Sequence, residues 1–149
     1  MKINNEMKLT FMSKSVNEGF ARSCAASFAA QLDPPIYELA DIRTAVSEAV
    51  TNCIVHAYRD KCGKIEMYMR ICDERELYIK ITDRGCGIAD IKQAMEPMFT
   101  TASSEERSGL GFSVMESFMD KLTVKSKPGK GTTVIMKKKL KETVSANGE

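Results

Sequence analysis

Long apolar runs are absent from this sequence. Nowhere do about 18 apolar residues follow one another, and residues 1–11 contain neither the apolar segment nor the small-residue cleavage site of a secretory signal. The sequence therefore predicts no membrane-spanning helix. We expect a cytoplasmic protein that makes no contact with a membrane.

The commonest metal-binding and phosphate-binding motifs are missing as well. His56 is the only histidine, and the cysteines include no Cys-x-x-Cys pair, so the sequence favours neither a zinc site nor a disulfide framework. We expect each cysteine to be a small, buried side chain that the cytosol keeps reduced. No glycine-rich run ends in Gly-Lys-Ser or Gly-Lys-Thr, which argues against a P-loop nucleotide site. The cysteines are Cys24, Cys53, Cys62, Cys72 and Cys86.

An excess of positive charge is also lacking. The 22 lysines and arginines stand against 20 acidic residues, which gives a net charge of +2. Nucleic-acid-binding domains usually concentrate far more positive charge, so we expect no direct contact with nucleic acid. The composition that remains is ordinary for a globular protein: 149 residues, 43% hydrophobic and 28% charged, which suits a single domain with one core.

Hydrophobic periodicity predicts the elements of the first part of the chain. Alternation of apolar and polar residues over 7–11 predicts a strand. Ser15 and Glu18 have capping-box spacing, which predicts the start of a helix. The prolines of 33–35 must end this helix, and a second helix is predicted over 37–58. The apolar face of the first helix is predicted to consist of Val16, Phe20, Cys24, Phe28 and Leu32.

The second part of the chain is predicted to supply most of the sheet. Strands are predicted over 65–71, 77–81, 122–126 and 132–140, with a short helix over 89–95 and a helical segment over 109–120. Residues 96–108 show no periodicity, and we expect them to be mobile. The predicted fold is a two-layer α/β sandwich, in which helices cover one face of a mostly antiparallel sheet of four or five strands. We expect a single domain over 1–140 and a disordered polar tail over 141–149.

A group of polar residues on the second predicted helix can carry chemistry. Glu48, Asn52 and His56 are spaced i, i+4 and i+8, so they share one helix face beside the apolar stripe. A carboxylate and an amide one turn apart can activate a hydroxyl and bind a hard cation such as Mg²⁺. A solvated polar face explains the same spacing, because such pairs are common on surface helices.

Two glycine-containing stretches follow. Asp83 comes directly after a predicted strand, and Gly85 and Gly87 let the backbone approach a ligand closely, although a plain turn explains the pattern equally well. Gly109 and Gly111 stand at the start of a predicted helix, where free amides and the helix dipole favour an anion such as phosphate. Glycine at a helix start also occurs for packing reasons.

The order of these motifs resembles that of the GHKL ATP-binding family. This family includes histidine kinases, the ATPase domains of gyrase and Hsp90, and serine kinases that act as bacterial anti-sigma factors. The resemblance rests on a helix with Glu48 and Asn52, on Asp-x-Gly-x-Gly at 83–87, on Gly-x-Gly-Phe at 109–112 and on Gly-Thr-Thr at 131–133. It implies a fold of the GHKL, or Bergerat, type and the binding of ATP with Mg²⁺.

Within the family, the residues of these motifs are most similar to those of the sporulation anti-sigma F factors, and the resemblance extends over nearly the whole chain. The similar stretches are 30–34, 47–52, 99–101, 106–112 and 131–133. This resemblance implies a protein serine kinase that binds and inhibits a sigma factor of RNA polymerase. It also implies that the kinase uses Mg²⁺ and ATP to phosphorylate a serine of an anti-anti-sigma factor.

The resemblance assigns roles to individual residues. By similarity, Glu48 polarises or deprotonates the attacking serine hydroxyl, Asn52 ligates Mg²⁺, and Arg107 neutralises charge on the γ-phosphate. Asp83 receives the adenine amino group. The remaining residues of the ATP site implied by the resemblance are Gly85, Gly87, Thr100, Thr101, Ser108, Gly109, Leu110, Gly111 and Thr133.

Partner contacts are expected on the first strand and the first helix. An edge strand exposes unpaired backbone groups, which a second copy could cover, so we expect a homodimer. By resemblance, Arg22 contacts both the sigma factor and the anti-anti-sigma factor. ATP is expected to order residues 96–108 more than ADP does, and so to choose between the two partners.

Two alternatives stay open at this point. One is a stress-response anti-sigma kinase of the same family, which differs in its partners. The other is a sigma-binding module that holds ATP as a structural ligand and performs no catalysis. A self-phosphorylating histidine kinase is disfavoured, because His56 lies within the helix that would bind Mg²⁺.

Overall fold

The computed structural model describes residues 2–59, 61–95 and 111–143. In chain order the elements are β1 (Ile3–Met12), α1 (Val16–Ala29), η1 (Ala30–Leu32), α2 (Ile36–Thr51), η2 (Asn52–Ala57), β2 (Lys64–Cys72), η3 (Asp73–Arg75), β3 (Glu76–Asp83), α3 (Ile91–Ala94), α4 (Phe112–Phe118), β4 (Lys121–Lys127) and β5 (Gly131–Lys139).

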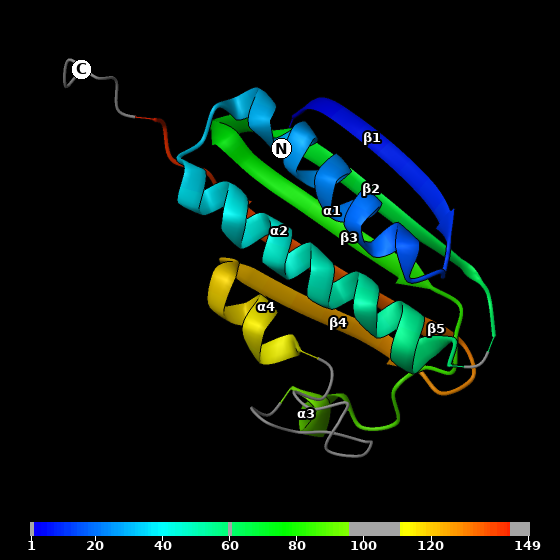
Figure 1. Ribbon diagram of the computed structural model, residues 1–149. Helices are drawn as coiled ribbons and strands as arrows, with labels where there is room; N and C mark the ends of the chain where they lie inside the picture. Colours follow the sequence, from blue (N-terminus) through cyan, green and yellow to red (C-terminus); the bar gives the residue numbers. More distant parts are fainter. Residues whose placement is uncertain (1, 60, 96–110, 144–149) are drawn as a thin grey trace.

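The sheet has the strand order β1-β2-β3-β5-β4, and all four neighbouring pairs are antiparallel. The helices α1, α2 and α4 lie together on one face of this sheet (Figure 1). In β2 and β3, buried and partly exposed residues alternate, as expected for strands with one covered face. The predicted two-layer α/β sandwich is therefore confirmed.

The core lies between the sheet and the helices. Burying apolar side chains here supplies the main driving force for the two-layer arrangement. Its largest fully buried side chains are Ile65, Met67 and Met69 from β2, Leu77, Ile79 and Ile81 from β3, Met136 from β5, Ile42, Val46 and Val50 from α2, and Phe112 and Met115 from α4.

The predicted apolar face of α1 is wrong in its first half. Val16 is 77% exposed and Phe20 is 52% exposed, whereas Ala21 and Ala25 are fully buried. The alanines bring α1 close to α2 and the sheet, because a methyl side chain lets two elements approach each other. The bulky residues are left on the outer side of the helix.

The first helix begins directly after Ser15, as predicted, but the cap of this helix and the end of the second helix need correction. Ser15 stands before α1, but its side chain makes no capping hydrogen bond, so the predicted capping box does not form. The second helix does not stay α-helical to Tyr58: it changes at Asn52 into η2, a π-helical segment. Such segments are rare and often occur at functional sites.

The first three residues of the predicted polar tail, 141–143, contact the domain. The backbone amide of Lys141 donates to the buried Glu38 (2.8 Å), and Arg75 donates to the carbonyl of Lys141 (2.7 Å). The hydroxyl of Thr143 donates to the carbonyl of Asp33 (2.6 Å). Residues 141–143 are therefore bound to the body of the domain, and the rest of the predicted tail lies outside the described residues.

The cysteines differ in exposure, and Cys24 is partly buried. All five are free, and Cys53 and Cys72 are buried as expected. Cys62 and Cys86 are exposed, so the expectation of burial is wrong for these two. Within the described residues, no helix is long and apolar enough to cross a membrane.

Candidate functional site

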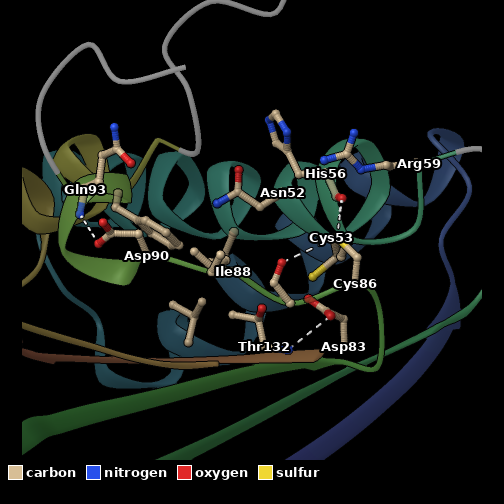
Figure 2. Close-up of a pocket in the computed structure, with 16 residues that line it drawn as sticks. Asn52, Cys53, His56, Arg59, Asp83, Cys86, Ile88, Asp90, Gln93 and Thr132 are labelled. Carbon is tan, nitrogen blue, oxygen red and sulfur yellow. Dashed lines mark hydrogen bonds between the residues drawn. The ribbon is translucent and has the colours of Figure 1, made fainter. Parts of the chain in front are cut away.

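A cavity of about 290 Å³ lies between the helical layer and the end of the sheet. Figure 2 shows Asn52 and His56 on its helical wall, with Asp83 and Thr132 on the side of the sheet. The fold thus brings together the polar helix face and the Asp83 motif, which are far apart in the sequence. The loop after β3 contributes Cys86, Gly87 and Ile88 to the lining.

Asp83 is the last residue of β3 and is only 5% exposed. Its Oδ1 accepts hydrogen bonds from the backbone amides of Gly85 (2.9 Å) and Thr132 (3.2 Å). Burial raises the pKa of Asp83 above its ordinary value, while these two amides and the Cys53 thiol act in the opposite direction. The carboxyl group is thereby held in one orientation at the wall of the cavity.

Cys53 supports this arrangement from the helical side. Burial, and next the charge of Asp83, raise the pKa of the Cys53 thiol well above its ordinary value. The thiol therefore stays protonated and can act as a weak hydrogen-bond donor to the carboxylate. Its role is to fix Asp83, since a protonated, buried thiol is a poor nucleophile.

The loop after Asp83 is held from several sides. The amide of Cys86 donates to the carbonyl of Ala57 (2.9 Å), and the amide of Ile88 donates to the hydroxyl of Ser126 (2.8 Å). A Cβ atom at Gly85 would collide with the backbone of Ala57. The glycine at 85 is thus required by packing against η2, and Gly85 is not part of the cavity lining.

Gly87 is needed for a second reason. Its φ is +77°, and a Cβ atom there would collide with the carbonyl oxygen of Lys127. Gly87 does line the cavity. Both glycines of the motif therefore let the loop pack closely, and only Gly87 also borders the space that a ligand could occupy.

The structure places Thr132 beside Asp83, whereas the resemblance implies Thr133 as the residue of the ATP site. Asp83 pairs with Thr132 across the β3–β5 ladder, while Thr133 pairs with Thr82. Neighbouring residues of a strand point to opposite faces, so Thr133 lies on the face away from the helices. Thr132 lines the cavity and is buried. Reading the alternation of Thr132, Val134 and Met136 would have identified it.

Glu48 lies on α2 and Asn52 follows one turn later, as predicted. Of the two residues, only Asn52 lines the cavity. Glu48 is partly buried and lies against Gly111, where a Cβ atom would collide with the Glu48 carboxylate. Gly111 has a φ of +67° and stands immediately before α4. Burial, and next the negative charge of Glu18, raise the pKa of Glu48 above its ordinary value.

Arg22 is half-exposed on α1 and is not a simple projecting side chain. Its guanidinium donates to Glu18 (3.1 Å) on the same helix and to the Ser47 hydroxyl (3.4 Å) on α2. The predicted partner-binding residue thus belongs to a polar contact between two helices.

Several predicted site residues lie outside the described residues. These include Arg107, one of the two catalytic candidates, and the whole segment predicted to be mobile, 96–108. The residues in question are Thr100, Thr101, Arg107, Ser108, Gly109 and Leu110.

Metal-binding clusters of the kind that hold zinc do not occur in the described parts of the chain. No group of three or more His, Cys, Asp or Glu side chains in 2–59, 61–95 and 111–143 could hold a metal ion. Asn52 on the cavity wall offers a side-chain oxygen that suits a hard cation, provided that other ligands come from a bound molecule.

Comparison with known proteins assigns the domain to a class. Residues 13–138 match the family model described as "Histidine kinase-like ATPase domain". The chain is 58% identical over 138 residues to the anti-sigma F factor of Caldanaerobacter subterraneus, which covers 93% of this chain and 96% of that relative. It is 52% identical over 137 residues to the anti-sigma F factor of Clostridium acetobutylicum, which covers 92% of this chain and 95% of that relative.

Solved structures show the same fold at low sequence identity. The RsbU and RsbW domains of a Mycobacterium tuberculosis protein match 92% of this chain and 33% of that chain, with a TM-score of 0.67 and 18% identity. The blue-light activated histidine kinase of Erythrobacter litoralis matches 79% of this chain and 40% of that chain, with a TM-score of 0.58 and 20% identity.

Proposed function

The chain belongs to the histidine kinase-like ATPase family and, within it, to the anti-sigma F factors, and from this premise we propose that it is both an anti-sigma factor and a protein serine kinase. It binds and inhibits a sporulation sigma factor of RNA polymerase. It also phosphorylates a serine of its anti-anti-sigma factor, with ATP and Mg²⁺ as cofactors.

The cavity supports ATP as the ligand. Its volume of about 290 Å³ suits the base and sugar of a nucleotide, and Asp83 offers a fixed carboxyl group to the adenine amino group. Asn52 lies on the opposite wall and would hold Mg²⁺ through its side-chain oxygen. Gly111 opens α4 next to Glu48, so free backbone amides at this helix start would face the phosphates.

The position of Glu48 supports catalysis. Bound ATP with Mg²⁺ would supply the phosphoryl group and its charge compensation. Glu48 would accept the proton of the substrate serine, and its raised pKa makes it a stronger base than an ordinary glutamate. The single observation that carries the proposal is the juxtaposition of a buried Asp83, Asn52 across the cavity, and Glu48 against the start of α4.

The test is a phosphoryl-transfer assay. The protein is incubated with radiolabelled ATP and a candidate anti-anti-sigma protein, with Mg²⁺ or with a chelator. We expect label on a serine of the partner only when Mg²⁺ is present, and the labelled residue is mapped by mass spectrometry. Tight ATP and sigma-factor binding without any transfer would leave only the binding-module function.

The exposed apolar surface of α1 supports a homodimer. β1 is an edge strand, and a shallow groove between β1 and α1 is lined by Met7, Phe20, Cys24 and Phe28. A second copy would cover this groove and the half-exposed Phe20.

Phe20→Glu is expected to weaken dimerisation. Removing a phenylalanine from an interface costs about 1.5–3 kcal/mol, which corresponds to roughly 10- to 150-fold in dissociation constant. Light scattering at graded protein concentrations measures the effect. Ile36→Glu is the matched control, because Ile36 is 83% exposed on α2. A monomer mass for the unmodified protein at micromolar concentration would remove the dimer from the proposal.

Cys86 provides a probe of the nucleotide cavity, because this thiol is exposed and lines it. ATP at ten times its dissociation constant is expected to slow alkylation of Cys86 by N-ethylmaleimide about tenfold, since only the free protein presents the thiol. Cys62 is exposed but does not line the cavity, so its alkylation serves as the internal control. Mass spectrometry of each peptide gives both rates. Equal labelling of Cys86 with and without ATP would place the nucleotide elsewhere.

A further inference from the structure

A row of three polar side chains crosses the sheet beside the nucleotide cavity. Asp83 on β3 pairs with Thr132 on β5, and Thr132 pairs with Ser126 on β4. Directly paired residues of antiparallel strands point to the same face, so all three lie on the face that the helices cover. Asp83 and Thr132 line the cavity (Figure 2), whereas Ser126 lies on the far side of Thr132 and does not line it.

Ser126 makes three hydrogen bonds with one hydroxyl group. The backbone amide of Ile88 donates to its oxygen (2.8 Å), and the hydroxyl donates to the carbonyl of Gly131 (2.9 Å). The third partner is the hydroxyl of Thr132, at 2.8 Å between the two oxygens. A serine hydroxyl has one proton and two lone pairs, so these three partners use its whole hydrogen-bonding capacity.

Counting protons fixes the direction of the bond between the two hydroxyls. The Gly131 carbonyl can only accept, so it takes the Ser126 proton. The Ile88 amide can only donate, so it occupies one lone pair of Ser126. The remaining bond therefore needs the proton of Thr132, which Thr132 donates to Ser126. The Thr132 hydroxyl is left with two lone pairs and no proton for a ligand in the cavity.

We propose that Ser126 is a positioning residue, which makes the Thr132 hydroxyl an acceptor and so sets the base selectivity of the cavity. The inference rests on the proposed function and deepens it. Thr132 and the Asp83 carboxylate together form a wall of acceptors. The adenine amino group carries two protons and fits such a wall, whereas the 6-oxo group of guanine or hypoxanthine would meet acceptors alone.

The same serine also holds the loop that follows β3. Its bond with the Ile88 amide joins this loop to β4, and Ile88 lines the cavity. Removal of the Ser126 hydroxyl would therefore loosen one wall of the cavity and also free the Thr132 proton. Only the second effect passes through the Thr132 hydroxyl, and it is the one that distinguishes a donor from an acceptor at position 6 of the purine. The two effects can thus be separated.

The experiment is a double-mutant cycle of nucleotide binding by the full chain, with ATP and inosine triphosphate (ITP) as probes. ITP carries a 6-oxo group in place of the amino group and has the same sugar and phosphates. Calorimetry gives the two dissociation constants. We expect Ser126→Ala to lower the preference for ATP over ITP by roughly 2- to 12-fold, because the freed Thr132 hydroxyl can donate to the 6-oxo group. In the Thr132→Val background, Ser126→Ala should leave the preference unchanged.

The control is a serine that makes a hydrogen bond far from the cavity. Ser117 is exposed on α4 and donates to the carbonyl of Ser113, so Ser117→Ala should leave the preference for ATP unchanged. An unchanged preference in Ser126→Ala would overturn the proposal. An equal drop with and without the Thr132 hydroxyl would overturn it as well, because Ser126 would then act through the loop alone.

NMR of the unmodified, ligand-free protein gives a readout that needs neither a variant nor a nucleotide. The Thr132 hydroxyl proton should exchange slowly and show a cross-peak to the β protons of Ser126. Exchange at the rate of a solvated hydroxyl would overturn the proposal, even if Ser126→Ala does not fold. If the unmodified protein binds no ATP, the proposed function fails, while the hydroxyl measurement still tests Ser126. If ATP binds and the preference does not respond to Ser126→Ala, the role of Ser126 fails and the function stands.

Discussion

Glu48→Gln is expected to lower the rate of serine phosphorylation by about 10²-fold or more, while ATP still binds. Glutamine keeps the size and hydrogen-bonding shape of the side chain but cannot take a proton. Glu48 lies against Gly111 and does not line the cavity that holds Asp83. Replacing the Glu48 carboxylate should therefore not disturb the part of the site proposed to bind adenine. Single-turnover phosphorylation and calorimetric ATP binding, measured on the same preparation, separate the two effects.

The pH dependence gives this prediction a further check. The Glu48 carboxyl group must be ionised to accept a proton. Because its pKa is raised, the enzyme should lose activity on acidification at a higher pH than it would with an ordinary glutamate. The rate should therefore fall on acidification through that raised pKa, and the glutamine variant should lack this limb. Glu116→Gln on α4 is the charge-matched control. A normal rate in Glu48→Gln would make Glu48 structural and favour the binding module.

The sheet could be predicted from the sequence because one of its faces is open. Because burial alternates along β2 and β3, apolar and polar residues also alternate in their sequences. Each predicted strand overlaps an observed one. The fold class follows from these strands and the helices between them. Strand order is not contained in the pattern, although it decides that β1 lies at an edge.

The first helix shows where periodicity misleads. Bulky residues such as Phe20 repeat every fourth position and suggest the buried face, but Ala21 and Ala25 are the ones that pack against the interior. Small side chains carry little hydrophobic signal, and yet they allow the closest approach of two elements. Only the exposed part of the bulky stripe, which includes Phe20, belongs to the surface that we propose a second copy to cover.

The sequence predicted which residues of the candidate site lie together better than it predicted their contacts. Asp83 and Asn52 do meet across one cavity, because the strand end and the helix are brought together by the fold. The π-helical turn at Asn52 could not be foreseen, since it depends on hydrogen bonds that no side-chain pattern encodes. The contact of Glu18 with Ser47 joins two helices and is equally invisible to local spacing.

Asp83→Asn is expected to weaken ATP binding by roughly 10- to 150-fold. Losing one hydrogen bond to a buried charged group costs on the order of 1.5–3 kcal/mol, and the Asn NH₂ would face the adenine amino group as a second donor. The variant should still fold, because an asparagine oxygen can accept from the amides of Gly85 and Thr132. Calorimetry with ATP and with GTP measures both affinity and base selectivity.

The stability of this variant follows from the sign of the pKa shift. Burial raises the pKa of Asp83 in the folded protein above its unfolded value. The contribution of Asp83 to the free energy of unfolding therefore falls as pH rises from its unfolded pKa through its folded pKa. A neutral asparagine avoids that loss, and thermal unfolding at neutral pH should show no large destabilisation. A weaker affinity for ATP would then report on the contact itself.

Base selectivity distinguishes a specific contact from a general change in charge. Guanine presents an acceptor oxygen where adenine has its amino group, so the Asn NH₂ should reduce the preference for ATP over GTP. Asp90→Asn is the matched control, because Asp90 lines the same cavity. Its carboxylate accepts a hydrogen bond from the backbone amide of Gln93 at the start of α3. That variant should keep its preference for ATP. Equal affinities for ATP and GTP in the unmodified protein would mean that Asp83 does not read the base.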